Sequence, residues 1–250
     1  MNTPSDITGI LAQVRAGRPL ARDQSCAVFD AMLTGVLSDE RLAEFLTALA
    51  ARGETVDEIA GAADAITARA TRVRCAADAI DTCGTGGDGI STFNTSTAAA
   101  LIAAAAGAVV AKHGNRSNLR VSGSAEVLAE LGVNINAPVA VLERCLSECG
   151  IAFLYAPNLH PAFKHVAPVR RQLGIRTIFN LVAPLCNPAG VRRQLVGVSK
   201  PGLTEPLARV LAARGATAAW IVHGHDGLCD LSITGPSQVT ELRDGQIRTF

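Results

Sequence analysis

The sequence predicts an α/β protein in which a small all-helical domain precedes a larger domain with a largely parallel central sheet. The first observation is a purely helical pattern from residue 4 to about residue 73. The second is a series of short aliphatic runs after residue 76 that alternate with helical segments. Strands separated by helices need crossover connections, which join parallel strands. We therefore expect domains at residues 1–73 and 74–250.

Composition limits the possible functions. The chain of 250 residues is 48% apolar but only 4% aromatic, which favours an aliphatic core and argues against disorder. Its 23 Lys and Arg residues balance 22 Asp and Glu residues, so the net charge of +1 provides no overall field for nucleic acid. An anion-binding site must therefore be local, and we expect no nucleic-acid partner.

The cysteines and the apolar runs indicate a cytoplasmic protein without a membrane segment. Seven cysteines are scattered, and the one close pair, Cys145 and Cys149, has helical rather than metal-binding spacing, so reduced thiols are expected. The N-terminus lacks the pattern of a signal peptide. The most apolar run, residues 96–112, is too short for a membrane span and predicts a buried helix followed by a strand.

The helical region carries clear start and stop signals. Ser38 can cap a helix whose apolar positions between residues 42 and 49 recur at i, i+3, i+4 and i+7, and Gly53 ends it. Thr55 and Glu58 form a capping box at the start of the next helix. We expect three or four short helices here and no strand.

The larger domain shows strands and helices in alternation. The candidate strands are residues 79–83, 108–112, 151–155, 176–181, 194–198 and 218–223, and the candidate helices are residues 95–106, 124–131, 137–148 and 204–214. Residues 239–250 read as a hairpin with its turn at Asp244-Gly245. In a parallel sheet the ligand loops lie at the carboxyl ends of the strands.

The stretch DTCGTGGDGISTFNTSTAAA, residues 81–100, predicts an anion-binding loop between a strand and a helix. Its glycines permit close approach of backbone, and Asn94 or Ser96 would lie at the start of the helix, where free N–H groups favour phosphate. It has neither the Gly-Lys-Ser/Thr of a P-loop nor the third glycine of a dinucleotide fingerprint. Asp88 would need a metal or a ligand hydroxyl in such a loop. The alternative is a glycine-rich turn that only packs closely.

Cationic side chains follow a second strand. The helix that starts near residue 124 is preceded by Lys112, His113, Asn115, Arg116 and Arg120. Cations at such density usually lie on a solvated surface, but directly after a parallel strand they would share an edge with the glycine loop. We therefore expect a second phosphate contact.

A third candidate segment, residues 155–190, adds histidines and arginines. His160 and His165 have no adjacent nucleophile, and isolated histidines are usually structural. Arg170 and Arg171 are neighbours on a helix, so we expect one to face inward and the other to face solvent. An inward arginine suits a planar carboxylate.

Together, these motifs resemble the anthranilate phosphoribosyltransferases of tryptophan biosynthesis. The matching stretches are GTGGDG…FNTST, AKHGNRS…SGSAEVLAELG, HPAFKHVAPVRRQLGIRTIFN and PLCNPA, in the family's order, with RGET…EIAGA in the helical region. The resemblance implies transfer of the phosphoribosyl group from 5-phosphoribosyl 1-diphosphate to anthranilate, with Mg²⁺ as cofactor. It also implies a homodimer formed through the helical domain, an inserted helical segment around residues 160–175 that packs on that domain, and an active site between the domains.

The resemblance assigns site residues one by one. The donor-binding residues it implies are Gly84, Gly87, Asp88, Thr92, Asn94, Thr95, Ser96, Thr97, Lys112, His113, Gly114, Asn115, Arg116 and Ser124. The anthranilate-binding residues are Gly84, Asn115 and Arg170, with His113 and His160 lining the way in. The implied metal ligands are Ser96 and Asp230, with Cys229 at the position of the family's Asp. No catalytic acid or base is implied.

Three features depart from the family pattern. Cys229 and Asp230 stand where relatives have Asp-Glu, which replaces a hard oxygen ligand by a thiol. Ala183 stands where relatives usually have glycine. Relatives also continue well beyond the position of Phe250, so a fragment or a degenerate relative is expected.

Two other functions remain open on the sequence. One is a nucleoside phosphorylase of related fold, which would release a base in a phosphate-dependent reaction. The other is a catalytically silent relative with a binding or regulatory role.

Overall fold

The structure, a computed structural model, describes residues 4–90, 93–116 and 123–250. The chain divides into two compact units, each described below by itself. The helical unit contains Met1–Ala70 and His160–Cys186, and the α/β unit contains Thr71–Leu159 and Asn187–Phe250. In this division the first segment of the helical unit ends at residue 70, and its later segment spans residues 160–186.

In the described part of its first segment, residues 4–70, the helical unit has four helices, in agreement with the predicted three or four. They are α1 (Pro4–Arg15), α2 (Arg22–Leu33), α3 (Asp39–Arg52) and α4 (Val56–Ala68). The predicted signals are confirmed, because Ser38 Oγ accepts the Arg41 N–H, Gly53 ends α3 at φ 91°, and Thr55 and Glu58 form the capping box. Helix α3 buries one apolar stripe, whereas α4 is buried on nearly all sides and lies in the core of this unit.

In the later segment of the helical unit, one strand prediction is wrong. This segment holds the 3₁₀ turns η1 (Pro161–His165) and η2 (Ala183–Leu185) and the helices α9 (Ala167–Leu173) and α10 (Ile178–Val182). Residues 176–181, predicted as a strand, mostly form α10. The Thr177 N–H donates to Asn180 Oδ1 at 3.0 Å, and the buried Phe179 ring packs edge-on against Phe29 and Phe163. Helix capping and packing among helices therefore override the β preference of Thr177, Ile178 and Phe179 in this short run.

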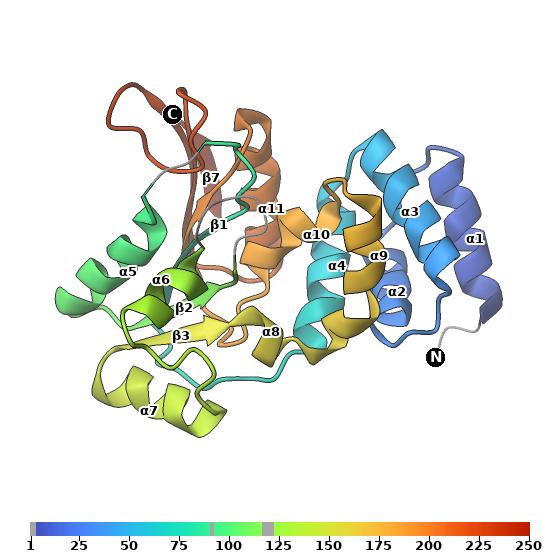
Figure 1. The fold of residues 1–250 in the computed structure, drawn as a ribbon. Coiled ribbons are helices and arrows are strands. Elements are labelled where there is room, and N and C mark those ends of the chain that lie inside the picture. Colours follow the sequence, from blue (N-terminus) through green and yellow to red (C-terminus); the bar gives the residue numbers. More distant parts are fainter. Residues whose placement is uncertain (1–3, 91–92, 117–122) are drawn as a thin grey trace. The chain divides into compact units, whose positions relative to one another are not determined.

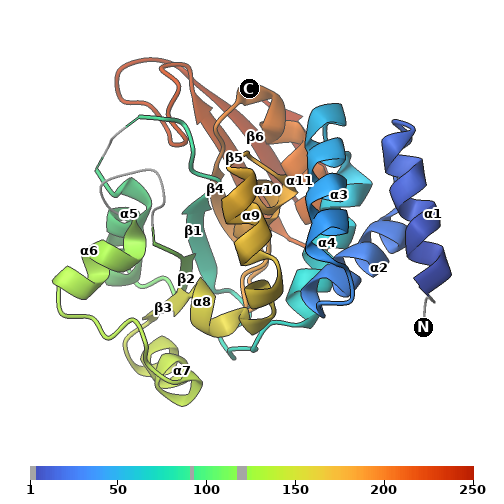
Figure 2. The same ribbon diagram turned by 45° about the vertical axis from the view of Figure 1, so that its right-hand side comes forward.

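In the described part of the chain, the α/β unit is built on a seven-stranded mixed sheet in the order β3-β2-β1-β4-β5-β6-β7 (Figure 1 and Figure 2). The strands are β1 (Ile80–Gly84), β2 (Val110–Gly114), β3 (Ile151–Tyr155), β4 (Arg193–Gly197), β5 (Ala218–Gly224), β6 (Ser237–Arg243) and β7 (Gln246–Thr249). The strands from β3 to β5 pair in parallel, while β6 and β7 pair antiparallel. The predicted hairpin is confirmed, with Asp244 and Gly245 at φ 50° and 79°.

Helices cover both faces of the sheet. They are α5 (Thr95–Ala105), α6 (Ser124–Glu130), α7 (Val139–Glu148), α8 (Ala156–Leu159) and α11 (Thr204–Ala213), with the 3₁₀ turn η3 (Pro201–Leu203) before α11. Along β3, Phe153 packs with α6, whereas Ala152 and Leu154 pack with α7 on the opposite face. At the other end of the sheet α11 contacts β5 and β6 (Figure 2). The alternation of side chains along each strand thus separates two apolar layers.

The expectation of a buried helix over the most apolar run is wrong. In α5 only Thr97 and Ala100 are buried, while Leu101 and Ile102 are 44% and 70% exposed. A helix on the outside of a sheet buries one side only, and the composition of α5 does not mark which side. Among the described residues, no helix is long and apolar enough to cross a bilayer. All seven cysteines are free thiols.

Candidate active site at the carboxyl edge of the sheet

The glycine loop leaves the sheet at its topological switch point. From β1 the chain continues to β2 and β3 on one side, whereas β4 and β5 lie on the other side. Ligands of open α/β sheets bind in the crevice at such a point, outside the carboxyl ends of the strands. The loop that follows β1 holds Gly86, Gly87 and Gly89 at φ 60°, 75° and 76°. Residues with a Cβ are strained at these angles, so the loop conformation requires glycine.

Backbone lies against backbone at the base of this loop. The Thr85 N–H donates to Gly197 O at 2.9 Å, and a Cβ on Gly84 would lie 3.2 Å from the same oxygen. A Cβ on Gly197 would lie 1.6 Å from Cys229 O. Glycine at these two positions therefore brings the ends of β1 and β4 and the loop after β5 into contact.

Asp88 joins the glycine loop to the loop after β5. Its two carboxylate oxygens accept the N–H groups of Ile90, at 3.3 Å, and Cys229, at 3.1 Å. The Cys229 thiol, buried in the same contact, lies 3.7 Å from Gly86 O. The carboxylate that sequence reasoning assigned to a metal or ligand hydroxyl thus also has main-chain partners, which hold the loop in place.

The predicted metal ligands Ser96 and Asp230 come from segments that meet. Asp230 Oδ2 accepts the hydroxyl of Thr95, the residue before Ser96, at 2.6 Å. Carboxylate and hydroxyl oxygens are the hard ligands that Mg²⁺ prefers, and two protein ligands suffice where a diphosphate supplies the others. The donor set therefore fits Mg²⁺. No group of three His, Cys, Asp or Glu side chains that would hold a metal by itself occurs among the described residues.

The start of α5 is fixed by hydrogen bonds to its neighbours. Asn94, one of the two residues expected at the start of this helix, is the N-cap residue of α5. Thr97 Oγ1 donates to Ser124 Oγ at 3.1 Å, which ties α5 to the first residue of α6. These contacts bring the two segments that the sequence assigned to phosphate to the same edge of the sheet.

Lys112 is buried rather than free at the surface. It is 2% exposed, and its ammonium group donates to Thr82 O at 2.7 Å and to Ser96 Oγ at 3.3 Å. Burial lowers the pKa of Lys112 and raises that of Asp81, and each of these charges opposes the shift of the other. The positive charge of Lys112 therefore lies beneath the glycine loop and the first turn of α5.

The segment after β2 is exposed beyond Gly114. A Cβ at Gly114 would lie 2.6 Å from the Phe153 ring, so the strand end requires glycine. Asn115 and Arg116 are exposed, and the guanidinium group of Arg116 donates to the Tyr155 hydroxyl at 3.1 Å. The predicted donor residue Thr92 and the cation Arg120 lie outside the described residues.

In the helical unit, the two neighbouring arginines differ as predicted. Arg170 is half-buried, with its guanidinium carbon 4.9 Å above the centre of the Phe179 ring, whereas Arg171 is exposed. His160 is 5% exposed, and burial lowers its pKa to about 4, so the imidazole is neutral at pH 7. Ala183 has φ −52°, an angle at which alanine replaces the family's glycine without strain.

Sequence reasoning missed two buried polar residues beside the site. Asp81 is fully buried in β1, and Asn187, which is 5% exposed, donates to its carboxylate at 2.8 Å. An aspartate inside an aliphatic strand was the available signal, because buried carboxylates need dedicated partners. Its partner is 106 residues away in the chain, so the pattern does not identify it.

The fold and the site define a glycosyltransferase of two parts. Residues 8–70 match the family model "Glycosyl transferase family, helical bundle domain", and residues 76–250 match "Glycosyl transferase family, a/b domain". Curated relatives narrow the class further. The chain is 50% identical over 246 residues to the anthranilate phosphoribosyltransferase of Afipia carboxidovorans, covering 98% of this chain and 73% of that protein. It is 51% identical over 248 residues to that of Rhodospirillum rubrum, covering 99% and 72%.

Solved structures agree with this assignment. The anthranilate phosphoribosyltransferase of Thermus thermophilus is 40% identical with a TM-score of 0.89, over 96% of this chain and 72% of that one. The Saccharomyces cerevisiae enzyme, in complex with PRPP and Mg, is 26% identical with a TM-score of 0.88, over 99% and 73%. The chain belongs to the anthranilate phosphoribosyltransferase family, which confirms the resemblance, the fold class and the enzyme class expected from the sequence.

Proposed function

We propose that this chain transfers the phosphoribosyl group of 5-phosphoribosyl 1-diphosphate to anthranilate, giving N-(5-phosphoribosyl)anthranilate and diphosphate. The observation that carries the proposal is the glycine loop at the switch point of the sheet, packed against the segments of Ser96 and Asp230. Relatives of the same family have been solved with PRPP and Mg and with 4-fluoroanthranilate.

The chemistry requires charge stabilisation more than proton transfer. Breaking the bond from C1 of ribose to diphosphate leaves negative charge on the leaving group, which main-chain N–H groups and the buried Lys112 charge stabilise. Mg²⁺ bound at Ser96 and Asp230 would supply further positive charge there. The amine of anthranilate needs orientation rather than a strong base, and Arg170 would provide it by binding the ortho carboxylate. The neutral His160 fits a role in lining the entrance to the proposed anthranilate site.

An activity assay tests the proposal. Loss of anthranilate fluorescence with PRPP and Mg²⁺ should be followed alongside the Rhodospirillum rubrum relative under the same conditions. Phosphate-dependent release of a base from nucleosides, without transfer to anthranilate, would support the nucleoside phosphorylase alternative instead. Background rates in both assays, while the relative is active, would support the silent alternative.

The thiol at residue 229 should weaken the proposed Mg²⁺ site. We expect low activity at ordinary Mg²⁺, a rise with added Mg²⁺ or Mn²⁺, and a further gain in Cys229→Asp, because that change restores a hard ligand. The Cys229 thiol lies beside Gly86 O, so a carboxylate there is repelled unless a cation lies nearby. The melting temperature of Cys229→Asp should therefore rise with Mg²⁺ and diphosphate more than that of the wild type.

Cys229→Ser is the matched control, since it removes sulfur without adding charge. If the wild type and Cys229→Asp both stay at background over the whole Mg²⁺ range while the relative works, this chain is not an active enzyme. An equal Mg²⁺ response in all three proteins would instead show that residue 229 does not contribute to the metal site.

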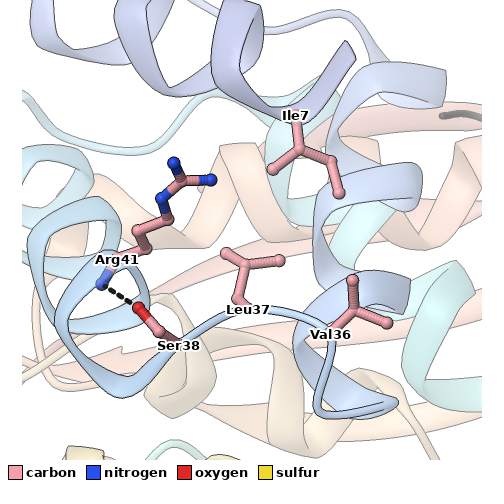
Figure 3. A pocket seen from close by; sticks show the side chains of 5 residues that line it. All are labelled: Ile7, Val36, Leu37, Ser38 and Arg41. Carbon is pink, nitrogen blue, oxygen red and sulfur yellow. Dashed lines mark hydrogen bonds between the residues drawn. The ribbon is translucent and has the colours of Figure 1, made fainter. Parts of the chain in front are cut away.

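We also propose that the helical unit forms a homodimer. Support comes from a surface pocket of about 200 Å³ lined by Ile7, Val36, Leu37, Ser38 and Arg41 (Figure 3). Three of these side chains are apolar, and Val36, in the turn before α3, is 63% exposed. An exposed apolar side chain at a pocket is typical of a surface that a second protein covers.

Sedimentation at micromolar concentration should therefore give a dimer for the wild type and a monomer for Val36→Glu, because a charge at the interface is costly to bury. Ile175→Glu is the control, since Ile175 is also an exposed apolar residue of the helical unit, at 46%, and does not line this pocket. A folded wild type that sediments as a monomer would contradict the proposal.

We also propose a cytoplasmic location for the protein. Its seven cysteines are free thiols, which is typical of proteins in a reducing compartment.

A further inference from the structure

The sheet opens between β1 and β2. The register of β1 with β4 runs over five residue pairs, and so does that of β2 with β3. Between β1 and β2 there is a single pair, Ile80 with Val110, although both strands continue for four more residues. The two strands whose carboxyl ends carry the proposed donor loops are therefore joined by a ladder at their start only.

Side chains take the places that the ladder leaves open. The Ile80 N–H donates to Val109 O at 2.9 Å, so a regular parallel ladder would continue with Thr82 N–H to Ala111 O and His113 N–H to Thr82 O. Instead, the main-chain groups are met from elsewhere. Asn187 Nδ2 donates to Ala111 O at 2.8 Å, Lys112 Nζ donates to Thr82 O at 2.7 Å, and Asp81 Oδ1 accepts the His113 N–H at 3.1 Å.

Asn187 is the centre of this arrangement. Its amide nitrogen donates to Asp81 Oδ2 on β1 and to Ala111 O on β2, and its carbonyl oxygen accepts the Ala189 N–H at 2.9 Å. The two hydrogen bonds of the amide nitrogen form a side-chain bridge from β1 to β2, and the bond to Ala111 O takes the place of a direct bond between the strands. We infer that this bridge keeps the strands apart. Because Asp81 and Asn187 are buried, water does not compete for these positions.

The opening lies directly beneath the proposed donor site. β1 ends at Gly84, two residues beyond Thr82, and the glycine loop follows it; the segment Gly114–Arg116 begins one residue beyond His113. We propose that Asp81 and Asn187 are positioning residues, which set the separation of β1 and β2 and thereby the spacing of these two loops for the diphosphate donor. The inference rests on the proposed function, because it assigns the pair to that same site.

Direct binding and steady-state kinetics test the pair. Calorimetry with PRPP and Mg²⁺ should show the donor Kd raised about tenfold or more in Asn187→Ala and in Asp81→Asn, the scale on which residues that orient a binding group act. The anthranilate KM at saturating donor should change little. A purely structural role would lower the melting temperature and the active fraction but leave the donor Kd of the folded protein unchanged.

Thr240→Val is the matched control. Thr240 is fully buried in β6, and its hydroxyl hydrogen-bonds to that of Thr249 at 2.9 Å, so the variant loses a buried polar contact of the same sheet away from the opening. It should lose stability without a change in donor Kd. If Asn187→Ala does not fold, the donor Kd of the near-isosteric Asp81→Asn provides the test of the positioning role. The wild type provides a variant-free test, because donor titration should shift the side-chain amide resonances of Asn187.

The outcomes separate this inference from the function on which it rests. A wild type that neither binds PRPP nor transfers it to anthranilate would overturn the proposed function. A wild type that binds PRPP, together with folded variants of unchanged donor Kd, would overturn only the positioning role. An unshifted Asn187 amide at donor saturation would also overturn it.

Discussion

Gly87→Val should abolish binding of the phosphoribosyl donor. Gly87 is exposed in the loop after β1 and has φ 75°, a conformation that costs a residue with a Cβ roughly 1–2 kcal/mol, and β-branched residues more. The valine side chain would also occupy the space in which phosphate must approach main-chain N–H groups. Calorimetry with PRPP and Mg²⁺ should detect no heat of binding at concentrations that saturate the wild type.

Gly215→Val separates backbone strain from loss of the site. Gly215 has φ 84°, and a Cβ placed on it would meet no atom within 4 Å. It precedes β5 and so lies at the amino ends of the parallel strands, opposite the proposed site. This variant should lose a similar amount of stability yet bind the donor as the wild type does. Unchanged donor affinity in folded Gly87→Val would show that the glycine loop does not bind the donor.

Arg170→Ala should raise the KM for anthranilate far more than the KM for the donor. A hydrogen bond to a charged group contributes about 1.5–3 kcal/mol, which corresponds to roughly 10- to 150-fold in KM at 1.4 kcal/mol per tenfold. The guanidinium group is half-buried above Phe179, so burial lowers the pKa of Arg170 and partial desolvation strengthens its pairing with a carboxylate. Steady-state kinetics with each substrate varied in turn measures the two constants.

Arg171→Ala is the neighbouring control, because its side chain is exposed on the same helix. We expect its constants to match the wild type within about twofold, as for most surface substitutions. Equal losses for both substrates in Arg170→Ala would indicate a general disturbance of the helical unit. Unaltered constants would show that another group binds the anthranilate carboxylate.

The strands and helices that the sequence predicted well are those with strong local signals. The Ser38 cap, the Thr55 and Glu58 capping box and the Asp244-Gly245 turn depend on residues within four positions of one another, and all three are present. The error at α10 arose where local preference and packing disagree. Phe179 suits a strand in isolation, but its partners Phe29 and Phe163 lie on helical segments.

The candidate site was predictable as a set of loops but not as a set of contacts. Each loop follows a strand, and parallel strands bring their carboxyl ends to one edge. Two contacts of the site join segments more than 130 residues apart in the chain. Asp88 accepts the Cys229 N–H, and Thr95 donates to Asp230. Sequence periodicity is local and contains no signal for such pairs.

By itself, the sequence determined the family, the fold class and the identity of the loops, because glycines, caps and alternating aliphatic runs act over a few residues. Only the tertiary structure decided which polar groups are buried together. The sequence places Lys112 among cations expected to contact phosphate, yet Lys112 is 2% exposed and fills a gap between strands with Asp81 and Asn187. The physical reason is that a buried charge is stable only with partners, and the fold alone brings those partners within reach.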